Sequence, residues 1–389
     1  MNVQTINVYL NTCSKERLVG IIAYRKQNIY FEYDQYFLNS NIQLSPYKLP
    51  LKSGIHSCED NVFDGLFGVF ADSMPDGWGR LLLDRYLLRK GIRYNGITPL
   101  DRLGYIGNYG TGALLYKPCI GSIEQNITRI NLDNLALQSM KILNDDGQED
   151  LEKLLILGGS SAGARPKVMV QIDQNNNIIS GNQTLQPGYN HYMIKFASHL
   201  DPKNIGKTEY LYSLMAKKAG IKMLNTKILQ GKYFAIERFD RIDDARVHVH
   251  SVAGLTHSDF RYPTLDYDDL LSLTLHLTKS VKEQVAMFRL ATFNLFAHNR
   301  DDHAKNFSFL LDVDNAWKLA PAYDLTFSEG PGGEHSTTYL GEGRNPRVEH
   351  LFRLAEKHNI KNANNVILEV KSAVDAFKLQ MKALNVVLD

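Results

Sequence analysis

Residues 297–311, AHNRDDHAKNFSFLL, decide the fold class, because a catalytic-loop pattern follows directly on a long amphipathic stretch. Arg300 and Asp301 are followed by four residues and then by Asn306, which is the R-D-x-x-x-x-N spacing of a kinase catalytic loop. In such a loop the Asp accepts the proton of an attacking hydroxyl, and the amide oxygen holds Mg²⁺ against the phosphates. The spacing therefore predicts a phosphoryl-transfer site with Asp301 as the base and Asn306 as a metal ligand.

Segments on both sides of this loop supply the other parts of a nucleotide site. Downstream, PAYDL (321–325) places Asp324 at the end of a short apolar strand, where kinase folds carry a second metal ligand. Upstream, GGSSAGARPK (158–167) lies between the apolar run LLIL and the strand-like VMVQI, where backbone N–H groups could enclose phosphates. It is neither a Walker A loop nor G-x-G-x-x-G.

The next part of the predicted nucleotide site is a lysine inside a predicted strand. Lys195 lies in HYMIKFA (191–197), and a buried ammonium group is costly unless an anion such as an ATP phosphate meets it. Glu209, at the start of the next predicted helix, could form an ion pair with Lys195. Alternatively, it could be an ordinary first-turn acid whose charge interacts favourably with the helix dipole. The segment FAIERFDR (234–241) could face the adenine base. These parts occur in the order that a protein-kinase-like enzyme requires.

Composition sets limits on the class of protein. The chain has 389 residues, 44 Lys and Arg, 42 Asp and Glu and a net charge of +2, which excludes nucleic-acid binding by bulk electrostatics. Cys13, Cys58 and Cys119 form neither a metal-binding pair nor a disulfide framework. No signal peptide or membrane-spanning run is found, so we expect a soluble cytoplasmic protein with no membrane contact.

Strand-like segments come first and helical ones later, which predicts an α+β, bilobal protein-kinase-like fold. We expect a small N-terminal subdomain over 1–150 and a kinase core over 151–389. The core divides into a β-rich nucleotide-binding part, 151–240, and a mostly helical catalytic lobe, 241–389.

Several local features are also predicted. A helix is expected from Asp76 to Arg89, with Asp76 as its N-cap and Trp78 as a packing anchor. Glycines 104, 107, 110 and 112 indicate an irregular connection, and 366–384 reads as one helix.

The segments SSAGARPK, YMIKFA, ERFDR, RDDHAKNFS and APAYDL together resemble the HipA family, the serine/threonine-kinase toxins of bacterial toxin–antitoxin modules. FADSMPDGWGR and IGNYGTGAL resemble the N-terminal domain of that family. The resemblance implies Asp301 as catalytic base, Asn306 and Asp324 as Mg²⁺ ligands and Lys195 on the ATP phosphates. The other residues expected to contact ATP are Glu237 and Phe239 at the adenine, and Ser161, Ala162, Gly163, Ala164 and His303.

The resemblance also implies regulation and partners. A serine of the Gly-rich loop would be autophosphorylated, either Ser160 or the adjacent Ser161. The partner would be a HipB-like helix-turn-helix antitoxin, with DNA contacted only through it. Some members of the family phosphorylate an aminoacyl-tRNA synthetase, but no residue of this sequence identifies the protein substrate.

Other functions remain open on the sequence alone. A non-catalytic, ATP-binding corepressor would act through an antitoxin on DNA, and a kinase could instead use a small-molecule hydroxyl. Asp302 and His303 could suggest a metal hydrolase, but no second cluster of ligands supports one. Asp302 itself could be solvated, could stabilise the loop or could contact substrate. The segment 328–346 lies where kinases keep an activation segment.

Overall fold

The chain forms two compact units, each discontinuous in sequence. One consists of residues 1–203 and 233–250, and the other of residues 204–232 and 251–389. The computed structural model describes residues 3–12, 15–92, 96–120, 127–146, 151–159, 161, 163–180 and 184–386. The boundary predicted at 150 stays a prediction.

The first unit begins with an antiparallel sheet in the order β4-β3-β2-β1-β5. Its strands are β1 (Thr5–Thr12), β2 (Lys15–Arg25), β3 (Asn28–Tyr33), β4 (Ile55–Ser57) and β5 (Leu114–Lys117). Strand residues alternate between solvent and core, so that Ile6, Val8 and Phe31 are buried while their neighbours along the strands are more exposed.

A second sheet of this unit carries the predicted nucleotide-binding segments. Its order within the unit is β7-β6-β8-β10, with β6 (Lys167–Asp173), β7 (Ile178–Ile179), β8 (Tyr189–Lys195) and β10 (Tyr233–Glu237). The antiparallel pairing predicted for the segments VMVQI and HYMIKFA is confirmed, in the register Lys167 opposite Lys195. The short hairpin of β11 (Arg241–Ile242) and β12 (Ala245–Arg246) follows.

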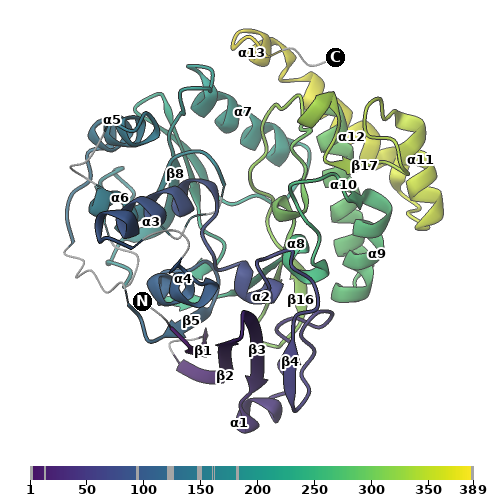
Figure 1. Ribbon diagram of the computed structural model, residues 1–389. Helices are drawn as coiled ribbons and strands as arrows, with labels where there is room; N and C mark the ends of the chain where they lie inside the picture. The colour runs from purple at the N-terminus through teal and green to yellow at the C-terminus, as the bar shows by residue number, and fades with distance from the viewer. Residues whose placement is uncertain are drawn as a thin grey trace. The chain divides into compact units, whose positions relative to one another are not determined.

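The helices of the first unit are α1 (Gln35–Leu38), α2 (Gly68–Ala71), α3 (Gly77–Arg89), α4 (Pro99–Ile106), α5 (Leu132–Leu143) and α6 (Leu151–Gly158). Trp78 is 1% exposed, so its role as a packing anchor is confirmed. Asp76 occupies the N-cap position of α3, but its carboxylate makes no capping bond to the helix and instead accepts from the Gly163 N–H. Helix α3 packs against α6 (Figure 1).

The irregular connection predicted around the four glycines is wrong at its start. Helix α4 runs through Gly104, because Thr98 and Asp101 form a capping box and Pro99 occupies the first turn. A glycine is needed at position 104 because a Cβ there would lie only 2.6 Å from Ile120 Cδ1. Close packing explains this glycine, which a count of glycines cannot distinguish from a turn residue.

The second unit is mainly helical, with α9, α10, α11 and α12 grouped together (green to yellow in Figure 1). Its helices are α7 (Ile205–Lys218), α8 (Val252–Thr256), α9 (Tyr267–Thr278), α10 (Val281–Phe296), α11 (Val348–Lys357), α12 (Ala363–Asp375) and α13 (Lys378–Lys382). Met287, Phe288 and Phe293 of α10 are fully buried. The single helix predicted over 366–384 is wrong, since the helix ends at Asp375 and restarts at Lys378.

Short strands complete the second unit: β9 (Thr226–Leu229), β14 (Leu265–Asp266), β15 (Ser308–Leu311), β16 (Trp317–Leu319) and β17 (Thr337–Thr338). β15 and β16 pair antiparallel, and β14 and β17 pair in parallel. The 3₁₀ turn η2 (Ala304–Asn306) lies between α10 and β15, and η3 (Pro331–Gly333) lies between β16 and β17. Strand β13 (His248–Ser251) spans the change of unit at His250. The predicted α+β class is confirmed. In the part of the chain that the structure describes, no helix is long and apolar enough to cross a membrane.

Candidate active site

The predicted catalytic loop connects α10 to β15 in the second unit. Helix α10 ends at Phe296, and His298 adopts a left-handed backbone with φ of 50°, which turns the chain away from the helix axis. The Asn299 side-chain amide then donates to Asn294 Oδ1 at 2.9 Å, which ties the start of the loop back to the helix. The loop therefore begins from a rigid element.

The two adjacent aspartates of this loop have opposite environments. The Asp301 side chain is 53% exposed and lines a pocket, whereas the Asp302 side chain is fully buried. Adjacent residues of an extended segment point to opposite sides, so one carboxylate reaches solvent while the next reaches the interior. Asp301 is thus the carboxylate that an acceptor hydroxyl could approach.

Asp302 is the centre of a buried hydrogen-bond network. Its carboxylate accepts from the Tyr267 hydroxyl at 2.7 Å, from His335 Nδ1 at 2.9 Å and from the Thr337 N–H at 3.1 Å. The Tyr267 hydroxyl in turn accepts from the Asn294 amide at 2.8 Å. Of the roles considered for Asp302, these contacts support loop stabilisation. They also bind the segment after residue 328 to the catalytic loop.

Asn306 is held against the same loop. Its side-chain nitrogen donates to the Asp301 carbonyl at 2.7 Å, and its backbone N–H donates to the His303 carbonyl at 2.8 Å. The side-chain oxygen takes no part in these bonds and is the atom that could ligate a cation.

The stretch that carries Asp324 is attached to the catalytic loop through its neighbour. Tyr323 donates its hydroxyl to the Lys305 carbonyl at 2.6 Å, and the Ser308 hydroxyl lies 2.6 Å from the same oxygen. Asp324 has a left-handed backbone with φ of 55°, a conformation that aspartate adopts more readily than most residues. It does not end a strand as expected, because β16 stops at Leu319.

His303 lies beside Asp301. The His303 Nε2 atom is 3.9 Å from Asp301 Oδ1, and its ring centroid is 5.8 Å from that of Phe260. Its Nδ1 atom is buried and has no hydrogen-bond partner among the described residues. The structure thus places His303 in the same pocket as Asp301.

The pocket has a volume of about 510 Å³. It is lined by Phe260, Arg261, Tyr262, Pro263, Asp301, His303, Ser328, Glu329, Gly330, Pro331 and Ser336. All of these residues belong to the second unit, so the pocket is a property of that unit alone.

The Gly-rich loop lies in the first unit, against the beginning of α3. The Gly163 N–H donates to the Asp76 carboxylate, and the Gly163 carbonyl accepts from the Trp78 N–H at 2.9 Å. Ser161 is fully buried, and its hydroxyl donates to the Gly158 carbonyl at 2.5 Å. Ser160 and Ala162 lie outside the described residues.

Lys195 faces a second lysine that the sequence reasoning missed. Lys195 and Lys167 are direct cross-strand partners, only 8% and 4% exposed, and Phe234 pairs with Lys195 on its other side. Two ammonium groups on one face of a sheet raise the local potential and favour an anion such as phosphate. A Cβ at Gly163 would overlap Lys167 Nζ, so the glycine lets this amino group lie against the loop. Lys167 is the last residue of GGSSAGARPK, so the sequence already places a lysine at the end of the Gly-rich loop.

The predicted adenine-facing residues flank a buried ion cluster. Glu237 ends β10 and Phe239 is half-buried two residues later. Asp240 accepts from Arg238 at 2.8 and 2.9 Å and from Arg241 at 2.7 Å. Despite its burial, these two guanidinium groups hold the pKa of Asp240 far below its usual range. The cluster fixes the backbone that carries Glu237 and Phe239, and nothing in the spacing of charges had singled out Asp240.

Glu209 lies in α7 of the second unit and is 3% exposed, whereas Lys195 belongs to the first unit. Their predicted ion pair therefore stays a prediction.

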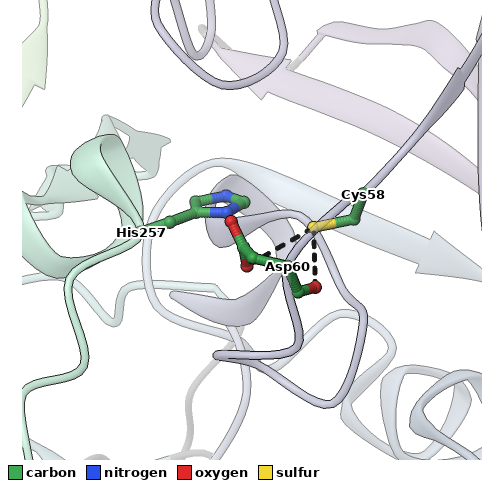
Figure 2. Close-up of side chains that lie close together, drawn as sticks. All are labelled: Cys58, Asp60 and His257. Carbon is green, nitrogen blue, oxygen red and sulfur yellow. Dashed lines mark hydrogen bonds between the residues drawn. The ribbon is translucent and has the colours of Figure 1, made fainter.

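Cys58 is not activated as a nucleophile. Cys58 donates its thiol to the Asp60 carbonyl at 3.4 Å and lies 3.7 Å from its carboxylate (Figure 2). Burial and the charge of Asp60 raise the pKa of the Cys58 thiol, which is the opposite of activation. Cys58 and Cys119 form no disulfide.

Two domain models of one protein family match the chain. The HipA N-terminal domain matches residues 8–117, and the HipA-like C-terminal domain matches residues 159–377. Among solved structures, the chain is similar to one from the Shewanella oneidensis MR-1 toxin–antitoxin complex of HipA, HipB and operator DNA. The TM-score is 0.70 at 17% identity, over 98% of this chain and 90% of that one. The Helicobacter pylori proinflammatory kinase CtkA matches 56% of this chain and 92% of its own at 12% identity, but its TM-score of 0.33 carries no argument.

Proposed function

Because the chain belongs to the HipA family, we propose that it is an ATP- and Mg²⁺-dependent protein serine/threonine kinase that acts as the toxin of a toxin–antitoxin module. The observation that carries the proposal is the position of Asp301. Its carboxylate is exposed in a pocket, while the loop behind it is fixed by the buried Asp302. This arrangement suits a base that must meet an external hydroxyl without moving.

Other residues of the chain fit the groups that the reaction needs. Asn306 and Asp324 offer oxygen ligands, which Mg²⁺ prefers. Lys195 and Lys167 offer two ammonium groups on one face of the sheet for the phosphates of a nucleotide. When bound, ATP with Mg²⁺ supplies the phosphoryl group and the charge that balances it.

The chain's own part in the chemistry is proton transfer and positioning. Asp301 would take the proton of the acceptor hydroxyl at a carboxylate oxygen as the hydroxyl attacks. The bond from the Asn306 side chain to the Asp301 carbonyl keeps the base and the candidate metal ligand in one geometry. His303, 3.9 Å from Asp301, adds a polar group beside the base.

We further propose that a HipB-like antitoxin binds this chain and provides any contact with DNA. The net charge of +2 gives the chain itself little attraction for nucleic acid, and the similar Shewanella oneidensis structure was solved with HipB and operator DNA. Autophosphorylation in the Gly-rich loop is part of the proposal. Ser161 would have to leave its buried position and its bond to Gly158 before it could react.

Expression of the chain without an antitoxin tests the proposal. We expect growth arrest and transfer of ³²P from the γ-phosphate of ATP to protein, and we expect Asp301→Gln to abolish both while the purified variant stays folded. Co-expression of a HipB-like antitoxin should restore growth. Growth that is unaffected by the wild-type chain, together with ATP binding but no transfer, would instead support the ATP-binding corepressor. Label that appears only in small molecules would indicate a small-molecule kinase.

A further inference from the structure

The pocket at Asp301 has two walls that are fixed relative to the base. On one wall, the Phe260 ring lies 4.2 Å from Lys305 Nζ and 5.8 Å from the His303 ring. Both partners belong to the catalytic loop, so the aromatic wall is anchored to the same segment that carries Asp301. The amino group over the ring face is a cation–π contact, which adds to this anchoring.

A second part of the lining, Gly330 and Pro331, is anchored to the residue before the base. The Arg300 guanidinium donates to the Gly333 carbonyl at 2.6 Å, and the Ser336 N–H donates to the Arg300 carbonyl at 3.1 Å. Gly330 has φ of 74°, and a Cβ there would come within 2.7 Å of the Arg300 side chain. Both parts of the lining are therefore anchored to the segment that carries Asp301.

Much of the lining is open to solvent. Tyr262 is 66% exposed, and Arg261, Pro263 and Glu329 are exposed as well. A pocket for a small molecule buries most of its ligand, whereas an extended polypeptide must enter and leave along an open side. The volume of about 510 Å³ also leaves room beside the acceptor hydroxyl for a further side chain.

The chemistry of the lining favours an apolar side chain at that place. Phe260, Tyr262 and Pro263 supply apolar surface on consecutive or nearly consecutive positions. Arg261 between them is held in a two-bond pair with Asp259, at 2.7 and 2.8 Å, which offsets its charge. The remaining carboxylates, Asp301 and Glu329, would repel an acidic neighbour of the acceptor residue.

We propose that this pocket binds the acceptor segment of a protein substrate in extended form and selects a large apolar side chain next to the acceptor serine or threonine. The inference rests on the proposed kinase function for its chemistry, but not for binding. Tyr262 would be a specificity-determining residue, since it is the exposed aromatic ring of the wall.

Matched peptides test the inference in the full-length protein. Four fluorescent peptides would differ only in the residue next to a central serine: Phe, Leu, Ala or Asp. We expect the Phe and Leu peptides to bind most tightly and the Asp peptide most weakly. Tyr262→Ala should weaken binding of the Phe peptide about fivefold, as expected for the loss of one aromatic contact, and should leave the affinity for the Ala peptide unchanged. Tyr36→Ala, which removes a tyrosine 86% exposed in the first unit, is the matched control and should change neither.

The same peptides are then used in phosphate transfer. We expect Tyr262→Ala to raise KM for the Phe peptide while kcat and KM for ATP stay at their wild-type values. The inference would be overturned if the Phe and Asp peptides bound equally tightly. It would also be overturned if the ratio of the affinities for the Phe and Ala peptides were the same in Tyr262→Ala as in the wild type. Fluorescence anisotropy of the labelled peptides measures binding without phosphate transfer. Selective binding of the peptides without any ³²P transferred to them would therefore refute the kinase proposal and leave the pocket assignment standing.

Discussion

Asp302 Oδ2 accepts a hydrogen bond from His335 Nδ1 at 2.9 Å, and the two side chains are 0% and 2% exposed. This bond joins the catalytic loop to a segment that begins more than twenty residues downstream of it. Tyr267 donates to the same oxygen, and burial together with the charge of Asp302 raises the pKa of Tyr267 far above its usual value. The phenol therefore remains a donor at any physiological pH, and the network keeps its polarity.

Removing the charge of Asp302 should unfold the loop locally and reduce stability. We expect Asp302→Asn to lower the free energy of unfolding by about 3 kcal/mol, because it leaves buried donors without a matching acceptor. Asp301→Asn is the matched control: its side chain is 53% exposed, so stability should change by less than about 0.5 kcal/mol while transfer is lost. Urea denaturation of both variants measures this, and equal destabilisation would contradict the division of roles.

Tyr323 should act on the metal requirement through its neighbour Asp324. Tyr323→Phe removes the hydroxyl that donates to the Lys305 carbonyl at 2.6 Å and so loosens the backbone that presents Asp324. We expect the Mg²⁺ concentration for half-maximal transfer to rise about tenfold, as for loss of other groups that orient metal ligands. Tyr210→Phe makes the same change in α7 and should have no effect. A Mg²⁺ titration that is unchanged in Tyr323→Phe would rule out this coupling.

Gly163 should be needed for nucleotide binding rather than for folding alone. Its φ is 89°, and an added Cβ would overlap Lys167 Nζ. We expect Gly163→Ala to raise KM for ATP about tenfold, because Lys167 must move from its place opposite Lys195. Gly188 has a φ of 81° and open space around it, so Gly188→Ala imposes similar backbone strain without the overlap. If both variants raise KM for ATP equally, strain rather than Lys167 is responsible.

Acid should destabilise the protein through His248. Burial, and next the charge of His250, lower the pKa of His248 from 6.5 to about 4. Between these values the unfolded chain binds a proton that the folded chain does not, so stability falls as pH falls from about 6.5 to 4. We expect a loss on the order of 2 kcal/mol from this residue, measured by urea denaturation at pH 7.5 and pH 4.5. His248→Asn should reduce the loss, and His276→Asn, at an exposed position, should not.

The spacing of Arg300, Asp301 and Asn306 could be read from the sequence because all three lie in one short segment. The partners of Asp302 could not, since Tyr267, His335 and Thr337 lie about 35 residues away along the chain and no local pattern joins them. The buried and exposed aspartates of the loop look alike in a sequence.

The sheet shows the same limit. Lys195 was recognised as a strand lysine, but Lys167 joins it only through the register of β6 and β8, which depends on the loop between the strands. The break between α12 and α13 and the glycine inside α4 depend on tertiary packing, which a periodic pattern does not record.

The alternation of the chain between the two units bears on how the protein folds during synthesis. Residues 1–203 leave the ribosome without the closing segment 233–250, and residues 204–232 emerge before the 251–389 portion against which they belong. The first unit is complete only when residue 250 has been translated, after residues 204–232 of the second unit have already emerged. A fragment that ends before residue 250 therefore lacks part of the first unit, and it would expose unfinished sheet and helix surfaces to proteases and chaperones.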